Sequence, residues 1–318
     1  MEILGCWLAM AVLGSLLSAV AYPTFCRWIE HFAPSLRSLV RVAYAGSAPV
    51  AALLAVVLVT QPQIAGFLIP THCHGLQCGA HTPVYAEGSV ILLIVASVCC
   101  LIVLMIVAAV LWALRRGYRR LRVLKAFAHS SGNGYRTLDS ADVLVCCVGL
   151  WRPGILVSRG LLDQLQPDEL AIVLAHEQAH VERLDNLRAL LLRWSTVFWP
   201  VPIAQRVRRD SRVDAEQACD LAAARAVGGP LSVISMIRKL ADLPFGTSRV
   251  ERYRSVGFDS DDAATRISAL QNSGRVEQLS ADQLCRVFVY LSLTWCMQIF
   301  LLTAVCHLVI EWLGSVAA

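Results

Sequence analysis

Four long stretches of this chain contain no Lys, Arg, Asp or Glu: residues 3–21, 42–60, 89–114 and 287–310. A helix that crosses the hydrocarbon core of a membrane needs about 20 mostly apolar residues, because lipid cannot satisfy free backbone groups and a helix satisfies its own. The composition agrees, since 57% of the 318 residues are hydrophobic and only 16% are charged. We therefore expect an integral membrane protein with four transmembrane helices, which excludes an ordinary soluble protein.

The charged residues are concentrated between the third and fourth stretches. Of the 51 Lys, Arg, Asp and Glu residues (28 plus 23), 44 lie between Arg115 and Arg286, 25 of them basic and 19 acidic. A segment of this length is enough for one compact domain. We therefore expect three parts: residues 1–114 with three membrane helices and an outer loop at 61–88, a polar domain at 115–286, and residues 287–318 with the last helix and a short outer tail.

The basic residues predict the orientation of the chain, because Lys and Arg are enriched in cytoplasmic loops. Arg27, Arg37 and Arg41 follow the first stretch, whereas the connection 61–88 contains neither Lys nor Arg. The third stretch then runs directly into Arg115 and further basic residues. We therefore expect both termini outside the cell and the polar domain in the cytoplasm.

The first stretch also contains Ala19-Val20-Ala21, which resembles a signal-peptide cleavage site. A signal peptide begins with a positively charged segment, whereas the only early charge here is Glu2. We therefore expect a retained membrane helix.

Residues 115–125 carry six basic side chains. Such a run is typical either of a nucleic-acid patch or of a juxtamembrane segment that contacts anionic lipid. Its position immediately inside a membrane helix favours the lipid bilayer as its partner. We therefore expect no nucleic-acid partner.

The outer loop contains a dense group of His and Cys residues, within the ten residues 72–81: His72, Cys73, His74, Cys78 and His81. Imidazole and thiolate suit zinc or copper, so these residues are candidates for a second metal site or a sensory input. The alternative is a disulfide between Cys73 and Cys78 with solvated histidines, which an oxidising compartment favours. The spacing matches no standard zinc motif and leaves both alternatives open.

A hairpin is expected in the polar domain. Residues 141–148 are rich in β-branched residues and cysteine, residues 149–154 carry turn residues, and Ile155–Ser158 is apolar again. We expect Ile155–Ser158 to be an edge strand that aligns a bound peptide by strand addition.

A metal-binding pattern follows the hairpin. Pro and acidic residues at 167–169 precede an apolar run and predict a helix over residues 168–183. It carries His176-Glu177-Gln178-Ala179-His180, the HExxH motif. The spacing puts both imidazoles on one helix face, where they can reach one Zn²⁺ with Glu177 beside the open coordination position. The alternative is a solvated helix face that happens to carry two histidines.

A third ligand is predicted on a second helix over residues 209–227, where Glu216 and Asp220 share a face at i and i+4. Glu216 would complete a three-ligand site with one position left for water. Asp220 would accept a hydrogen bond from a ligand imidazole. The alternative is that both acids are solvated. Residues 187–205, interrupted by Arg and Pro, are expected to be a buried or membrane-grazing segment joining the two helices rather than a fifth span.

The two motifs resemble those of one family. The run from His176 to Asp185 (HEQAHVERLD), followed by EQACD from Glu216 to Asp220, is similar to the patterns of the BlaR/MecR-type membrane zinc peptidases, the beta-lactam-sensing signal transducers and their relatives. The four-helix topology is similar too. The resemblance implies zinc held by His176, His180 and Glu216, with Glu177 as general base, and it implies a bacterial inner (cytoplasmic) membrane. It places Asp185 with Asp220 among the residues that orient the ligands.

The chain departs from those transducers in one respect. They carry a penicillin-binding sensor after the fourth helix, whereas this sequence ends eight residues after Ile310. We therefore expect no beta-lactam sensing by acylation.

The expected fold is mainly α, with four transmembrane helices and an α+β zinc domain between the third and fourth. The leading hypothesis is a zinc endopeptidase that cleaves a cytoplasmic or membrane-associated protein, with His129 and several arginines open as oxyanion-stabilising groups. The alternatives are a metal-dependent sensor that cuts nothing, or an HExxH…ExxxD peptidase for prenylated proteins or quality control. The sequence leaves open whether the chain forms a homodimer.

Overall fold

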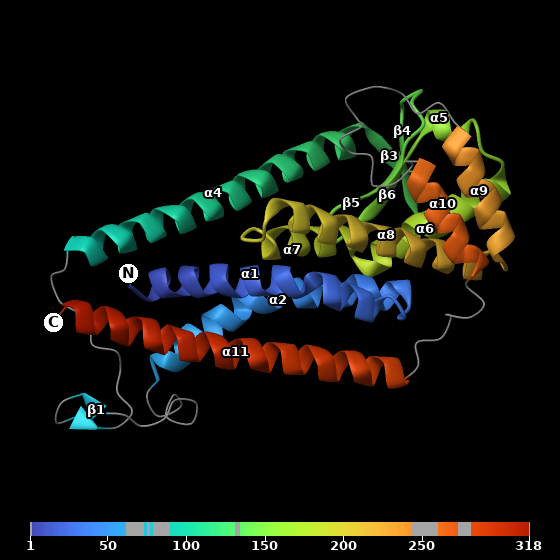
Figure 1. Cartoon of the computed structure of the whole chain (residues 1–318). Coiled ribbons are helices and arrows are strands. Elements are labelled where there is room, and N and C mark those ends of the chain that lie inside the picture. Colours follow the sequence, from blue (N-terminus) through green and yellow to red (C-terminus); the bar gives the residue numbers. More distant parts are fainter. Residues whose placement is uncertain are drawn as a thin grey trace.

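The computed structural model describes residues 2–61, 73–74, 77–78, 90–130, 134–242, 260–272 and 281–317. It is mainly helical (Figure 1). Within these residues, four helices are long and apolar enough to cross a membrane, namely α1 (Glu2–Ile29), α2 (Pro34–Val59), α4 (Val90–Phe127) and α11 (Ala281–Ala317). The prediction of four candidate membrane helices is confirmed.

Each of these helices is longer than the charge-free stretch that it overlaps. The helix α2 begins at Pro34, where proline suits the first turn of a helix, and it therefore includes Arg37 and Arg41. The helix α4 continues through the basic run to Phe127. A charged residue ends an apolar stretch without ending a helix, since Arg and Lys have high helix propensity. The two arginines thus project from the first turns of α2 rather than from a loop.

The helix α2 packs between α1 and α11. Small residues make this close approach possible, because they let helix backbones come together. A Cβ atom added to Gly14 of α1 would lie 3.2 Å from Leu302 Cδ1 of α11 and 3.4 Å from Ala48 Cβ of α2. The helix α4 packs against α1 and diverges from the other three towards the sheet (Figure 1).

The polar part contains a four-stranded sheet in the order β3-β4-β6-β5. Its strands are β3 (Ala128–Ser130), β4 (Tyr135–Leu138), β5 (Val145–Val148) and β6 (Gly154–Ser158). The strands β5 and β6 pair antiparallel, which confirms the predicted hairpin. The strand β6 also pairs in parallel with β4.

The prediction that Ile155–Ser158 is an edge strand is wrong. Ile155–Ser158 lies in β6, which is an interior strand of the sheet, whereas β3 and β5 form its two edges in the described part of the chain. The reason is the parallel pairing of β4 with the second side of β6. Consistent with this place, four consecutive residues of β6 are buried, as expected for a strand covered on both faces.

Between the sheet and α11 the described residues form the helices α5 (Arg159–Leu162), α6 (Pro167–Arg183), α7 (Asp185–Ser195), α8 (Val201–Ala226), α9 (Pro230–Asp242) and α10 (Ser260–Gln271). The predicted HExxH helix is confirmed within one residue. It starts with a capping box between Gln166 and Glu169 and ends at Arg183, and the C-cap residue Leu184 has a positive φ of 54°. A core of apolar residues joins β6, α6, α8, α9 and α10, including Val157, Val173, Leu221, Ile237 and Leu270.

The predicted burial of the joining segment 187–205 holds for one side of it, which packs against α2, whereas Leu191, Val197 and Val201 are exposed. It forms most of α7, a bend and the start of α8, and both helices pack against α2. Leu192 and Trp199 are 2% and 4% exposed and belong to one apolar cluster with Tyr22 and Tyr44 of the membrane helices. The helix α8, which carries the EQACD motif, and α7, which follows the HExxH helix α6, are therefore packed directly onto α2.

Candidate metal centre

The helices α6 and α8 bring three of the predicted ligand residues together. His176 Nε2 lies 3.5 Å from Glu216 Oε2, and His180 Nε2 lies 3.5 Å from Glu216 Oε1. Their ligand atoms all lie within 4.8 Å of one another, in a cluster with the composition of a metal site. Two motifs 36 positions apart (from His180 to Glu216) thus converge because α6 and α8 pack side by side.

The dimensions of this cluster fit zinc. Zinc binds nitrogen and oxygen ligands at about 2.0–2.2 Å in a tetrahedral arrangement, so two of its ligand atoms stand roughly 3.3–3.6 Å apart. Both His-to-Glu separations of 3.5 Å fall in this range. The donor set of two imidazoles and one carboxylate is one that catalytic zinc sites use, with a fourth position left for water or substrate.

Each imidazole is oriented by a carboxylate at its other nitrogen. His176 Nδ1 lies 3.0 Å from Asp220 Oδ1, and His180 Nδ1 lies 2.8 Å from Asp185 Oδ2. A carboxylate in this place accepts the Nδ1–H hydrogen and leaves the Nε2 lone pair facing the metal. The residues expected to orient the ligands, Asp220 and Asp185, lie in the positions that this role requires.

Electrostatics keep the carboxylates of the centre charged. Burial acts to raise the pKa of Glu216, but hydrogen bonds from His176 and His180 and the charge of Arg266 lower it well below its usual range. The pKa of Asp220 is lowered too, since the ion pair with Arg266 outweighs the opposing effect of burial. Charged carboxylates are the form in which they bind a cation or accept from an imidazole.

Glu177 stands beside the cluster in a different environment. Its side chain is 5% exposed, and its Oε2 has no hydrogen-bond partner among the described residues. Burial raises the pKa of Glu177, although the neighbouring His176 and His180 partly oppose this. A raised pKa makes a carboxylate a better proton acceptor near neutral pH. The pKa of Glu177 is thus raised and that of Glu216 is lowered, which suits Glu177 to accept a proton and Glu216 to bind a cation.

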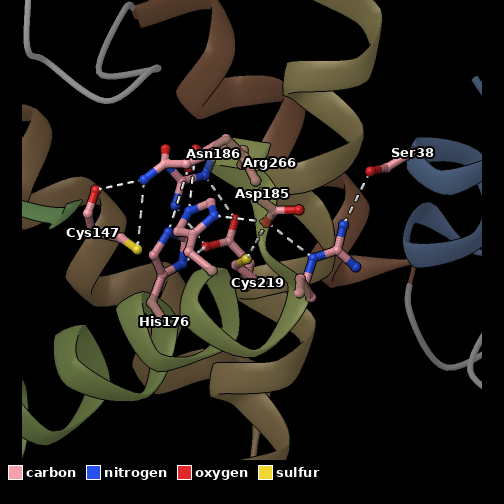
Figure 2. A network of polar contacts seen from close by, with 11 residues as sticks. Ser38, Cys147, His176, Asp185, Asn186, Cys219 and Arg266 are labelled. Carbon is pink, nitrogen blue, oxygen red and sulfur yellow. Dashed lines mark hydrogen bonds and ion pairs between the residues drawn. The ribbon is translucent and has the colours of Figure 1, made fainter. Parts of the chain in front are cut away.

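Arg266 is a residue of this centre that we did not predict. It comes from α10, is 4% exposed, and donates from Nε and NH2 to the two oxygens of Asp220 at 2.7 and 2.6 Å. Its NH1 lies 3.3 Å from Glu216 Oε2 (Figure 2). One feature of the sequence indicates that Arg266 is buried, because it shares a helix face with Ala263 and Leu270, which are also buried. A charged residue on a buried face requires a charged partner.

Asn186 is a second residue near this centre that we did not predict. Its Nδ2 donates to the backbone oxygens of Cys147 at 2.9 Å and Gly149 at 3.1 Å, and it thereby ties the start of α7 to the end of β5 (Figure 2). The edge strand is thus held next to the HExxH helix, against which it packs. His129, in contrast, lies on β3 at the opposite edge of the sheet, so it is not brought close to β5.

Three cysteines lie around the centre. Burial raises the pKa of Cys146 to about 12, and it raises the pKa values of Cys147 and Cys219 to about 11. Cys219 Sγ donates to Asp185 Oδ2 at 3.6 Å and forms with His180 and Asp185 a second group of potential ligands. Because Asp185 already accepts from His180, we interpret this group as the hydrogen-bonded support of His180.

The outer His/Cys group is not part of this centre. Within it the structure describes the backbone of two short strands, β1 (Cys73–His74) and β2 (Gln77–Cys78), which pair antiparallel with Cys73 opposite Cys78. His72 and His81 lie outside the described residues. The choice between a metal site and a disulfide therefore stays open. Figure 1 places this hairpin near the chain termini, far from the four-stranded sheet.

Comparison with known protein families gives a match over about the middle of the chain. Residues 72–228 match the family model described as BlaR1 peptidase M56. No curated protein and no solved structure matches the chain significantly. The matched segment contains His176, Glu177, His180 and Glu216, while Arg266 lies beyond it.

Proposed function

We propose that this chain, which residues 72–228 identify as a relative of the BlaR1 peptidase M56 family, is a membrane zinc endopeptidase acting in regulated proteolysis. The family match and the four candidate membrane helices support a membrane metallopeptidase. The observation that carries the finer proposal is the convergence of His176, His180 and Glu216 at tetrahedral spacing, beside the buried carboxylate of Glu177. A protein is the substrate of such an enzyme.

His176, His180 and Glu216 would hold the metal. When bound, zinc supplies Lewis acidity, which polarises a peptide carbonyl and acidifies a water. Glu177 would accept a proton from the attacking water and return it to the leaving amine, a role that its burial favours because burial raises the pKa of its carboxyl group. Asp220 and Asp185 keep the two imidazoles in the tautomer that offers Nε2 to the metal.

The edge strand β5 aligns the substrate in this proposal. An extended peptide can add to the free edge of a sheet through backbone hydrogen bonds. The strand β5 replaces β6 in this role because it is the sheet edge that packs against α6. Asn186 supports it by holding the Cys147 and Gly149 carbonyls.

We place the centre on the cytoplasmic side of a bacterial inner membrane, with both termini outside and the zinc domain at residues 115–286 between the third and fourth spans. The contact of Asp214 with Arg37 and Arg41 supports this arrangement, because it puts the α1–α2 connection and the metal centre on the same side of the bilayer. The positive-inside rule assigns that side to the cytoplasm.

The test compares wild type with Glu177→Gln, purified in lipid nanodiscs. The variant removes the proton acceptor while keeping the shape of the side chain, so it should retain zinc by elemental analysis and lose hydrolysis of membrane and cytoplasmic proteins by 10²-fold or more, on the order of a general-base contribution. Glu182→Gln is the matched control, since Glu182 lies exposed on the same helix.

Two outcomes would overturn the proposal. A Glu177→Gln variant that cleaves at the wild-type rate would remove Glu177 from the mechanism. A zinc-loaded wild type with no cleavage product, in a proteomic comparison with the variant, would indicate a metal-dependent sensor instead. Mass measurement of the same preparation decides between a monomer and a homodimer.

A further inference from the structure

The first turns of α2 carry three polar side chains that face the metal-binding helices rather than solvent: Arg37, Ser38 and Arg41. Arg41 and Ser38 are only 4% and 1% exposed, and the Arg37 side chain is 16% exposed. A positive charge that merely orients a membrane helix needs only to lie near the cytoplasmic surface. The burial of Arg41 and the partial burial of Arg37 at the start of a membrane helix therefore require another explanation.

Both arginines meet one carboxylate on α8. Arg41 Nε donates to Asp214 Oδ2 at 2.8 Å, and Arg37 Nε lies 2.9 Å from Asp214 Oδ1. Asp214 is 3% exposed. The charge is balanced by a second acid one turn earlier, because Arg41 NH1 lies 3.6 Å from Asp210 Oδ2, which also accepts from Tyr22 of α1. Two arginines of α2 and two aspartates of α8, together with Tyr22 of α1, thus join α1 and α2 to α8.

Asp214 stands two positions before Glu216, the proposed ligand. Residues two apart on an α-helix point in nearly opposite directions, since each residue turns the helix by about 100°. Asp214 therefore holds one face of α8 against α2, while Glu216 presents the other face to His176 and His180. Gln217 adds to this hold by accepting from Arg37 NH2 at 2.6 Å. These contacts with α2 therefore constrain the rotation and axial position of α8, and with them the position of the Glu216 carboxylate, in addition to the packing of α8 on α6.

Ser38 reaches the other helix of the centre. Its Oγ accepts from Arg183 NH2 at 3.2 Å, and Arg183 Nε donates to Asp185 Oδ2 at 3.1 Å. The same Asp185 oxygen lies 2.8 Å from His180 Nδ1. Figure 2 shows this chain of contacts running from Ser38 to Asp185. One helical turn of α2 thus contacts both Asp214, on the helix of Glu216, and Arg183, which leads through Asp185 to His180.

We propose that Arg37, Ser38 and Arg41 are positioning residues, which hold His180 and Glu216 at the separation that a metal requires and thereby make metal binding depend on the setting of α2. This inference rests on the proposed metal site. It assigns no chemical step to the three residues, since they act through Asp214, Arg183 and Asp185.

The test measures binding of Co²⁺, a spectroscopic stand-in for zinc, by the full chain in lipid nanodiscs. Asp214→Asn removes the charge that pairs with both arginines while preserving shape. We expect Co²⁺ affinity to fall by about 10- to 100-fold, the range for loss of groups that support metal ligands, with a changed visible absorption spectrum. Asp282→Asn is the control, because Asp282 pairs with Arg286 at an exposed position on α11.

Ser38→Ala provides a second route, since it removes one hydroxyl and leaves no buried charge unpaired. It should fold even where Asp214→Asn does not, and it should weaken Co²⁺ binding by severalfold. If either folded variant keeps the wild-type affinity and spectrum, the positioning role of its contact is overturned. Failure of wild type itself to bind Co²⁺ would overturn the proposed metal site and this inference with it, so the two failures are distinguishable.

Discussion

Asp220→Asn tests how far the centre depends on residues that do not touch the metal. Asp220 is 1% exposed, and its two oxygens serve three donors: Arg266 Nε, Arg266 NH2 and His176 Nδ1. An asparagine of the same shape keeps one acceptor oxygen and turns an NH2 group towards a donor. The variant therefore loses the negative charge, part of the ion pair with Arg266 and the orientation of His176.

The structure predicts two separable losses. Loss of the acceptor for His176 should weaken zinc binding by about 10- to 100-fold, or about 1.4–2.8 kcal/mol. Removal of one partner of a buried ion pair costs about 3–5 kcal/mol of folding stability. Because the amide still accepts one hydrogen bond and Glu216 remains 3.3 Å from Arg266 NH1, we expect no more than about 3 kcal/mol for the metal-free protein.

Zinc affinity is measured by competition with a chelator, and stability by unfolding of the metal-free protein in denaturant. Asp242→Asn is the control, because Asp242 is exposed at the end of α9. The reasoning is refuted if folded Asp220→Asn binds zinc as tightly as wild type, since the contact with His176 would then have no role in holding the ligand.

Three further predictions concern the ion pair of Glu169, removal of the metal, and the Cys73 and Cys78 thiols. The hydrogen bond from Lys239, with that from the Gln166 backbone, lowers the pKa of the partly exposed Glu169. At pH values above the unfolded pKa of about 4.3, the charged carboxylate therefore adds up to ~1 kcal/mol to the free energy of unfolding, and this contribution is lost as the pH falls through the lower folded pKa. In thermal unfolding, Glu169→Gln should be as stable as wild type in acid and less stable than wild type at neutral pH. Chelation of the metal should lower the stability by about 2.7 kcal/mol relative to zinc at 100 times its Kd, and unchanged unfolding after metal removal would contradict a site that spans α6 and α8. In the outer loop, a Cys73–Cys78 disulfide leaves both thiols unlabelled by alkylation until reduction, whereas a metal site leaves them labelled once the metal is chelated; mass spectrometry of the intact protein decides between them.

The parts of the fold that local signals specify were predictable from the sequence. The helix α6 was expected at 168–183 and lies at Pro167–Arg183, because its proline, acidic first turn and HExxH spacing are all local. The hairpin of β5 and β6 was predictable for the same reason, since its turn residues lie between two apolar runs. The four membrane helices follow from apolar length alone.

What the sequence did not show depends on contacts between distant segments. The order of the sheet was missed because β4 joins β6 in parallel across a connection that carries no local signal. In the sequence we interpreted Arg37 and Arg41 as signals of membrane orientation. In the structure they pair with Asp214, more than 170 positions away along the chain. Arg266 was missed in its contact with Asp220 for the same reason.

X-ray absorption at the zinc edge of the purified protein tests the central claim most directly. The ligand set His176, His180 and Glu216 predicts a first shell of nitrogen and oxygen atoms only, at about 2.0–2.2 Å, with a fourth light atom from solvent. The competing group His180, Asp185 and Cys219 would instead place a sulfur atom at about 2.3 Å from the metal. A sulfur shell that disappears in Cys219→Ser would contradict the proposed centre, and a shell without sulfur that is lost in Glu216→Ala would support it.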